Sequence, residues 1–364
     1  MTTVPMSSTD RNYTPALTGL RGFAAAWVFA YHAWQFSGGH ALVIGPIDLT
    51  PLFAGGYYGV DLFFVLSGFL IGRPFLLARM HGQAMPSLRT FWTHRLRRVF
   101  PAYLVQLGIL LAIVGVLEHA EPLSVGRLFG HLTLTFNLVE NDSVVNPVYW
   151  SLPVEWDFYI VLPLLALGFW RQQAIPWIVP AMLGFAIGFR ILCWQLLFVT
   201  PPNGDLFRWT LQLPARIDQL VIGMMAAWIA LHWPGLSKRR SRFCVLVGTI
   251  LLLACVWVSV AKGDDFDPRR LPWAYFAQTL AAIAFACLIY AAASGSQIMH
   301  TIFGNPALRW LGTISFSLYL WHWIILNRLQ PLHLATTTML AIAIAGSLAV
   351  AWLSWRFVER PCAA

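Results

Sequence analysis

Long apolar runs alternate with short polar segments along most of the chain. A helix needs about 20 apolar residues to cross the hydrocarbon core of a bilayer. Runs of this length occupy residues 17–36, 57–78, 99–117, 150–170, 174–199, 213–232, 243–260, 272–293, 310–328 and 334–355. The pattern therefore predicts an all-α, polytopic integral membrane protein with about ten transmembrane helices.

A further apolar run, at 128–139, is shorter and carries His131, Thr133 and Asn137. By itself it fits a span, an interfacial helix or a re-entrant segment. Positive charge collects in cytoplasmic loops. With ten spans and a cytoplasmic N-terminus, the basic loop 73–98 and the Lys238–Arg242 cluster both face the cytoplasm, whereas a span at 128–139 would move that cluster outside. We therefore expect both termini to be cytoplasmic and 118–149 to be an outside excursion, with the mixed-charge loop 262–270 also outside.

The rest of the organisation is simple. We expect a membrane domain at 17–358 between cytoplasmic tails at 1–16 and 359–364. The first sixteen residues lack a basic segment, and no A-x-A site follows, so the first apolar run is not expected to be a removed signal peptide.

Composition supports the membrane class. Apolar residues make up 58% of the 364 residues and charged residues 11%, against about 45–50% and about 25% in soluble domains. The five cysteines are scattered, so neither a disulfide framework nor a metal site is expected. All but two of the 24 basic residues are arginine, and the net charge is +9. The bias fits either genome composition or phosphate recognition by the planar guanidinium. No nucleic-acid partner is expected.

Ionisable side chains in the predicted spans are candidates for function, because each costs several kcal/mol in a bilayer. Arg21 and His32 lie eleven residues apart on the first predicted helix, near its inner and outer ends. Eleven residues turn a helix by about 1,100°, which returns the side chain to nearly the same face. One helix face thus carries a cation and an imidazole.

Other charged residues fall in the predicted outer halves of different helices, which predicts one polar cavity. Its expected lining is His32, Asp61, Glu155, Arg216, Asp218 and His322, with Ser151 and Asp157 assigned to the same cavity. Two simpler interpretations stay open: Asp61 and Arg216 as a structural ion pair, and His322 as part of an interfacial aromatic belt. Gly68 and Gly72 are interpreted as a close helix-packing face.

The predicted inner side carries a cluster of arginines at residues 73, 79, 95, 97 and 98. The positive charge that sets membrane orientation explains most of these arginines. The cluster could also bind an anion, because each guanidinium offers two parallel hydrogen-bond donors. Neither a P-loop nor a G-x-G-x-x-G motif accompanies it. A histidine beside a carboxylate is a usable general base, and no G-x-S-x-G elbow is present, which leaves Ser67 and Ser151 as weak nucleophile candidates. Together these features suggest group transfer from a donor held inside to an acceptor held towards the outside.

Short motifs run in order through nearly the whole chain. They are Leu17–Gly22 with Arg21 and His32, Gly59–Leu70, Phe91–Pro101 with Arg95 and Arg98, Trp150–Glu155, Arg216–Gly223, Ser315–His322 and Glu359–Pro361. Together they resemble the acyltransferase-3 family of integral membrane acyltransferases. The resemblance implies ten helices, an acyl-CoA donor (usually acetyl-CoA) and transfer to a sugar hydroxyl.

The resemblance also implies a site and a setting. It implies that Arg21, His32, Arg95 or Arg98, and Glu155 are the residues that matter most. We accordingly assign His32 and Glu155 to catalysis, and we assign acyl-CoA binding to Arg21, Arg73, Arg95 and Arg98. The expected acceptor is an exopolysaccharide or lipid-linked repeat unit, with a macrolide or another glycosylated metabolite as the alternative. The expected place is a bacterial cytoplasmic membrane, with membrane lipid and polysaccharide-assembly proteins as partners and no permanently bound cofactor.

The expected mechanism is direct transfer. The arginines hold the phosphates of the donor, and His32, oriented by Glu155 or Asp61, takes the proton of the acceptor hydroxyl. Two other functions fit part of the pattern. A transporter or flippase would also have a charged cavity, although the inverted repeats of many transporters are not evident. An inactive assembly subunit would leave His32 and Glu155 unexplained.

Overall fold

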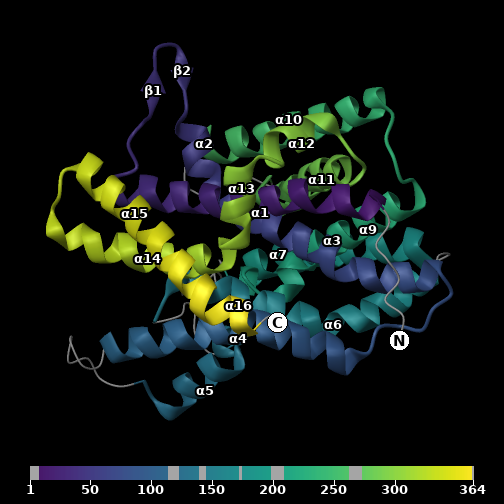
Figure 1. Ribbon diagram of the computed structural model, residues 1–364, viewed down its shortest axis with the longest axis horizontal. Helices are drawn as coiled ribbons and strands as arrows, with labels where there is room; N and C mark the ends of the chain where they lie inside the picture. The colour runs from purple at the N-terminus through teal and green to yellow at the C-terminus, as the bar shows by residue number, and fades with distance from the viewer. Residues whose placement is uncertain are drawn as a thin grey trace. The chain divides into compact units, whose positions relative to one another are not determined.

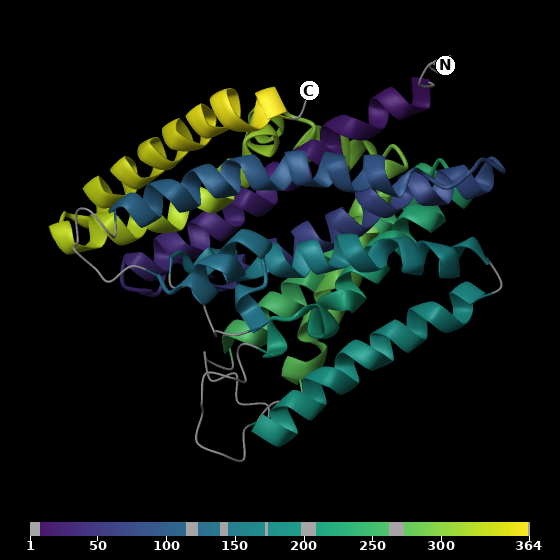
Figure 2. The same cartoon turned by 90° about the horizontal axis from the view of Figure 1, so that it is seen from below.

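The computed structural model describes residues 8–113, 123–138, 145–171, 174–197, 209–261 and 273–362 (Figures 1 and 2). Nearly all of these residues are helical, which confirms the predicted all-α class. Besides turns and short loops, the described residues contain a small hairpin in which β1 (Val43–Ile44) pairs antiparallel with β2 (Ile47–Asp48). The predicted loop 262–270, and parts of both predicted tails and of the 118–149 excursion, lie outside the described residues.

The helices, with the labels of Figure 1, have the following bounds. They are α1 (Ser8–Phe36), α2 (Thr50–Ala54), η1 (Gly55–Tyr57), α3 (Tyr58–Met80), α4 (Leu88–Ala112), α5 (Val125–Thr133), η3 (Phe136–Leu138), η4 (Pro147–Trp150), α6 (Ser151–Trp170), α7 (Ile175–Leu197), α9 (Leu213–His232), α10 (Lys238–Ala261), α11 (Trp273–Ala293), α12 (Gln297–Phe303), α13 (Pro306–Thr313), α14 (Ser315–Leu329), η6 (Gln330–Leu332), α15 (Thr336–Ser354), the π-helical turn η7 (Trp355–Glu359) and α16 (Arg360–Cys362).

Seven helical segments among the described residues are long and apolar enough to cross a membrane. They are Thr50–Met80, Pro147–Phe169, Ile175–Gln195, Leu213–His232, Lys238–Val260, Tyr275–Ala293 and Thr336–Cys362. Each corresponds to one of the predicted spans. The other three predicted spans are helical where the structure describes them: 17–36 lies in α1, 99–112 lies in α4, and 310–328 is shared by α13 and α14. A total of ten spans therefore stays a prediction.

Two predicted apolar runs differ from single long helices. The described part of the run 128–139, which ends at residue 138, falls in the nine-residue helix α5 and the turn η3, and Leu134 ends α5 in a left-handed conformation. Nine residues are too few for a helix to cross a bilayer. The run 310–328 is divided at Ile314 between α13 and α14, and the Ser315 hydroxyl donates to the Gly312 carbonyl 2.9 Å away at this break.

The chain forms two compact units. Unit 1 comprises Met1–Tyr31, His40–His81 and Asp218–Ser315, and unit 2 comprises His32–Gly39, Gly82–Ile217 and Phe316–Ala364. The helices α1 and α9 each contribute residues to both units. His32 therefore belongs to unit 2, whereas Arg21 belongs to unit 1.

Glycine allows backbones to touch inside unit 1. A methyl group added at Gly68 of α3 would lie 2.0 Å from the Leu220 carbonyl oxygen of α9, and one added at Gly223 of α9 would lie 2.1 Å from the Val65 carbonyl oxygen. Gly72 likewise meets the Met224 side chain. Small residues permit this close approach. In a bilayer, helix association depends on such packing because the hydrophobic effect does not drive helices together there. The predicted packing face at Gly68 and Gly72 is thus present.

Unit 2 has an aromatic interior crossed by polar contacts. Tyr103, Tyr149, Phe158 and Tyr159 are fully buried, and α4 contacts α6 and the turn η7. A buried polar group needs a hydrogen-bond partner. The Gln106 amide of α4 accordingly donates to the Leu320 carbonyl oxygen at 2.7 Å and accepts from the Tyr149 hydroxyl at 2.8 Å. These hydrogen bonds join α4, η4 and α14 within unit 2.

Candidate active site

Two histidines from distant parts of the sequence meet in unit 2. Nδ1 of His32, near the end of α1, lies 3.0 Å from Nε2 of His322 on α14, and the ring centroids are 5.0 Å apart. His322 is buried, whereas His32 is half-buried. Sequence reasoning placed both residues in the polar cavity without pairing them. In this pair, His32 is an imidazole that could act on a proton, and His322 is a second imidazole that holds the His32 ring by a hydrogen bond.

The segment of α14 that carries His322 is fixed from several sides. Nδ1 of His322 lies 3.0 Å from the Leu318 carbonyl oxygen and 2.8 Å from that of Tyr319. The Leu320 carbonyl oxygen accepts from the amide of Asn146, 3.0 Å away, as well as from Gln106. These bonds limit rotation of the His322 ring and movement of its backbone.

Within the part of the chain that the structure describes, the Ser151 hydroxyl bonds to a tyrosine and to no basic side chain. The Tyr319 hydroxyl donates its single hydrogen to the Val148 carbonyl oxygen, 2.8 Å away. The Ser151 hydroxyl, 2.8 Å from the Tyr319 oxygen, is therefore the donor in that pair. An activated nucleophile needs an adjacent base. This geometry gives Ser151 a role in joining α6 to α14.

Glu155 lies on α6 within a contact network that also includes an arginine. The Tyr159 hydroxyl, one helical turn away, donates to the Glu155 carboxylate at 2.5 Å. The Arg95 guanidinium lies over the Tyr159 ring, 5.9 Å from its centroid. The Trp92 indole donates to the Tyr159 carbonyl oxygen at 3.1 Å. Tyr159, which sequence analysis did not single out, thus connects the predicted catalytic carboxylate with a predicted donor-binding arginine.

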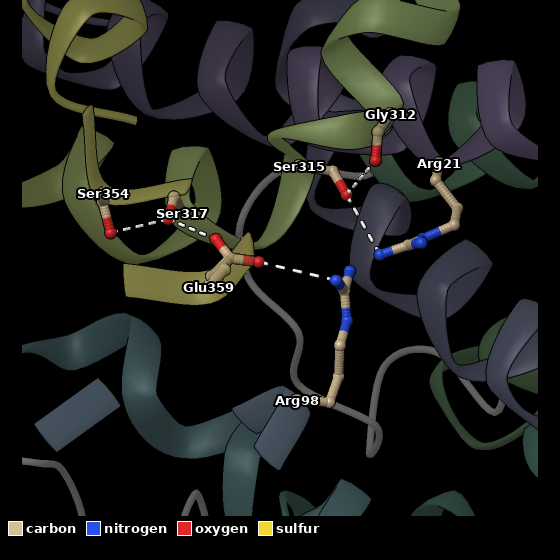
Figure 3. A network of polar contacts seen from close by, with 7 residues as sticks. All are labelled: Arg21, Arg98, Gly312, Ser315, Ser317, Ser354 and Glu359. Atoms are coloured by element: carbon tan, nitrogen blue, oxygen red, sulfur yellow. Dashed lines mark hydrogen bonds and ion pairs between the residues drawn. The ribbon is translucent and has the colours of Figure 1, made fainter. Parts of the chain in front are cut away.

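A second arginine of α4 pairs with a buried acid near the C-terminus. Arg98 Nη1 lies 3.6 Å from Glu359 Oε2, and the side-chain exposures are 30% and 2%. The Ser317 hydroxyl of α14 bonds to the other Glu359 oxygen and is linked to the Ser354 hydroxyl at 2.8 Å. Figure 3 shows this network, which lies wholly in unit 2. Glu359 was assigned to the predicted tail, although it begins the Glu359–Pro361 motif and is the only acidic residue after Asp267.

Arg21 has its own network in unit 1, which Figure 3 also draws. Its Nη2 donates to the Ser315 hydroxyl at 3.2 Å, and that hydroxyl donates to the Gly312 carbonyl oxygen. Arg73, the other predicted donor-binding arginine of unit 1, is half-buried on α3. In this way the break between α13 and α14 supplies the hydroxyl that orients Arg21.

The other predicted cavity residues are divided between the units. Asp61 and Asp218 are buried in unit 1, where the Thr279 hydroxyl donates to Asp218. Arg216 and Asp157 are half-buried in unit 2. Arg216 donates to the Thr210 carbonyl oxygen at 3.2 Å, and its guanidinium lies 5.5 Å from the centroid of a Trp150 ring. Asp218 and Arg216 are thus each held by a polar or aromatic neighbour of their own unit.

A third histidine of unit 2 has a structural environment. His131 of α5 is fully buried, its ring stacks on Phe136 with centroids 4.6 Å apart, and its carbonyl oxygen accepts from the Tyr103 hydroxyl at 2.9 Å. Burial lowers the pKa of His131 from 6.5 to about 4. The ring is therefore neutral at physiological pH, and it anchors α5 to α4.

Comparisons with known proteins agree with the sequence motifs. The family model described as an acyltransferase domain matches residues 14–356. The chain is 28% identical to the peptidoglycan O-acetyltransferase OatA of Listeria monocytogenes, over 97% of this chain and 56% of that protein. It is 29% identical to YrhL of Bacillus subtilis, provisionally named a peptidoglycan O-acetyltransferase, over 96% of this chain and 55% of that protein. The chain thus spans about half the length of these relatives. No solved structure matches it significantly.

Proposed function

Because the chain belongs to the family of membrane acyltransferases described by that domain, we propose that it transfers an acetyl group from acyl-CoA to a hydroxyl group of a glycan. The observation that carries this proposal is the contact between His32 and His322. Acyl transfer to a hydroxyl needs a group that removes the hydroxyl proton, and histidine serves this role most often.

The α4 arginines are the proposed binding groups for the donor. Arg95 and Arg98 are three residues apart, so they project from neighbouring positions on one helix face. The guanidinium forks match phosphate oxygens in pairs. Tyr159 packs against Arg95, and Glu359 pairs with Arg98. Both forks are therefore oriented before a donor binds. The roles of Arg21 and Arg73 stay predictions from the sequence.

The proposed reaction is a direct transfer. His32 takes the proton of the acceptor hydroxyl, and the oxygen attacks the thioester carbonyl. A carbon–oxygen bond forms, the carbon–sulfur bond breaks, and its electron pair leaves on sulfur. The proton then passes from His32 to the thiolate and yields free CoA. No cofactor, oxidant or metal enters this balance.

Glu155 is the second proposed catalytic residue. Its carboxylate accepts from the Tyr159 hydroxyl, and the Arg95 guanidinium lies over the Tyr159 ring. A negatively charged Glu155 would hold the Tyr159 hydroxyl. Through the Tyr159 ring it would keep the Arg95 guanidinium near the donor phosphates. We propose that loss of Glu155 weakens transfer through this route, in addition to any direct contact with His32.

The proposed acceptor is a sugar of the bacterial cell envelope, and the proposed place is the cytoplasmic membrane. Relatives from Listeria and Bacillus carry names that refer to peptidoglycan O-acetylation. The chemistry shared by peptidoglycan, exopolysaccharide and lipid-linked repeat units is an exposed sugar hydroxyl. The proposed acceptor class is therefore this hydroxyl, and product mass would identify the particular glycan.

The test uses the full chain purified into lipid nanodiscs with radiolabelled acetyl-CoA and a crude cell-envelope glycan fraction. We expect CoA release and label in the glycan, both lost in His32→Gln. The matched control is His81→Gln, because His81 is exposed in the segment after α3 and belongs to no network described above. Full activity of His32→Gln would overturn the proposed role of His32. Absence of CoA release from the wild type with every fraction, together with uptake of glycan precursors by proteoliposomes, would favour a transporter.

A further inference from the structure

We infer that His322 is a positioning residue that fixes the tautomer of His32, so that the lone pair of His32 lies on Nε2. The inference concerns which nitrogen of His32 accepts the proton. Its kinetic consequence rests on the proposed function, whereas the tautomer itself can be measured without any activity.

The first step is the protonation of His322. Its Nδ1 lies within hydrogen-bond distance of two backbone carbonyl oxygens, those of Leu318 and Tyr319. A carbonyl oxygen can only accept. Nδ1 of His322 must therefore carry a hydrogen, which it shares between the two oxygens.

The second step is the neutral state of His322. The side chain is 1% exposed. A charged imidazole in an apolar interior is costly unless a counter-charge compensates it. A neutral ring with its hydrogen on Nδ1 has its lone pair on Nε2. That lone pair faces Nδ1 of His32 at 3.0 Å.

The third step transfers this constraint to His32. Because Nε2 of His322 is an acceptor, Nδ1 of His32 must be the donor. A neutral imidazole has one hydrogen, so the lone pair of His32 is left on Nε2. The carbonyl–His322–His32 chain thereby selects one of two tautomers, as the carboxylate does in a catalytic triad.

The fourth step concerns rigidity. The bonds from Gln106 and Asn146 to the Leu320 carbonyl oxygen, and the bond from Tyr319 to Val148, fix this part of α14 to neighbouring segments of unit 2. A ring held this way keeps its Nε2 directed at His32. Outer-shell hydrogen bonds of this kind orient functional histidines in other proteins.

The chain of hydrogen bonds is also suited to an apolar setting. It is uncharged at rest, so no buried carboxylate is needed next to His32. When Nε2 of His32 takes a proton, Nδ1–H of the imidazolium donates to His322. The two carbonyl oxygens beyond His322 strengthen this acceptor, because hydrogen bonds in a chain polarise one another.

The first experiment measures the tautomer by ¹⁵N NMR of ring-labelled histidine, with the full chain in nanodiscs at a pH above 7. The His32 signals are identified by their loss in His32→Gln. We expect a protonated Nδ1 and an unprotonated Nε2 for His32, and a mixture of both tautomers in His322→Leu. A His32 ring protonated on Nε2 in the wild type would overturn the inference.

The second experiment compares three variants of one position. His322→Gln can place an amide oxygen near the former Nε2 and still accept from His32, whereas the shorter His322→Asn can serve the backbone carbonyls but does not reach His32. We expect kcat to fall about 100-fold or more in His322→Leu and His322→Asn, since a correctly protonated general base contributes about 10²–10⁴-fold. KM for acetyl-CoA should stay unchanged, and His322→Gln should keep clearly more activity than His322→Asn.

Equal activity of the Gln and Asn variants, or a change confined to KM, would overturn the positioning role. The two failures are distinguishable. If the wild type releases no CoA with any acceptor, the proposed function fails, while the NMR result on the same sample still decides the tautomer. If one variant does not fold, the wild-type spectrum still tests the inference, because it needs no variant of His322.

Discussion

At the scale of single residues, the structure replaces several isolated candidates with pairs. His32 contacts His322, Glu155 accepts from Tyr159, and Arg98 pairs with Glu359. A buried charge that loses its partner costs more than the pair is worth. A substitution at Arg98 can therefore act through chemistry or through stability, and a double variant with Glu359 separates the two.

Arg98→Ala should destabilise the folded protein by about 1–3 kcal/mol, because it leaves the Glu359 carboxylate buried without its cation. The expected cost is below the 3–5 kcal/mol of a fully buried pair, since the Arg98 side chain is 30% exposed. Adding Glu359→Gln should restore much of the thermal midpoint. Donor binding should stay weak in the double variant if Arg98 contacts the phosphates. Recovery of both stability and binding would contradict that contact.

His131 should make stability depend on pH. Its folded pKa of about 4 is below the ordinary 6.5, so the unfolded state binds more protons between these values. Stability from this group is complete above about pH 6.5 and decreases towards pH 4, by about 3 kcal/mol in total. Unfolding measured from pH 4 to 7 should therefore show a steeper slope in the wild type than in His131→Phe. Equal slopes would show that His131 is not buried in its neutral form.

At the scale of helices, backbone contact through glycine determines the packing of unit 1. The carbonyl oxygens of Leu220 and Val65 lie where a methyl group would stand at Gly68 and at Gly223. A backbone atom cannot move aside as a flexible side chain can. The helices α3 and α9 therefore depend on glycine at these positions, and substitutions by alanine are informative.

Gly68→Ala should lower the thermal midpoint and the yield of monodisperse protein, because the added methyl group would lie 2.0 Å from a carbonyl oxygen. Overpacking of this kind costs about 1–3 kcal/mol. Gly184→Ala on α7 is the matched control, since nothing lies within 4 Å of its added methyl group. The measurement is size-exclusion chromatography with a thermal ramp in detergent. Equal midpoints for the two variants would mean that α3 and α9 do not touch as described.

At the scale of the whole molecule, the predicted topology assigns the two ends of α3 to opposite sides of the membrane. The hairpin before α2 would be outside, and the segment after α3 would be cytoplasmic. The hairpin and the segment after α3 are both exposed within unit 1, with Ile44 at 67% exposure and His81 also exposed. The arrangement follows from positive charge alone and is open to a direct test.

Single cysteines introduced as Ile44→Cys and His81→Cys should react with a membrane-impermeant thiol reagent from opposite sides. We expect Ile44→Cys to react in intact cells and His81→Cys only in inside-out vesicles. The background is the chain with its five native cysteines replaced, because Cys244, Cys287 and Cys362 are half-buried rather than fully buried. Reaction of both variants from one side would contradict a membrane-spanning α3.

The sequence by itself determined the membrane class, the helical fold and the family. It also determined the positions of the seven helices that are long and apolar enough to cross a membrane. These are properties of local runs and ordered motifs, since a bilayer demands a fixed length of apolar helix. Only the tertiary structure decided the partners: His322 for His32 across 290 positions, Glu359 for Arg98, and a break at Ile314 that gives Arg21 the Ser315 hydroxyl. Helices that are apolar on all sides carry no pattern that tells which face meets which neighbour. Their rotation and depth come from packing, and those two quantities determine which polar side chains touch.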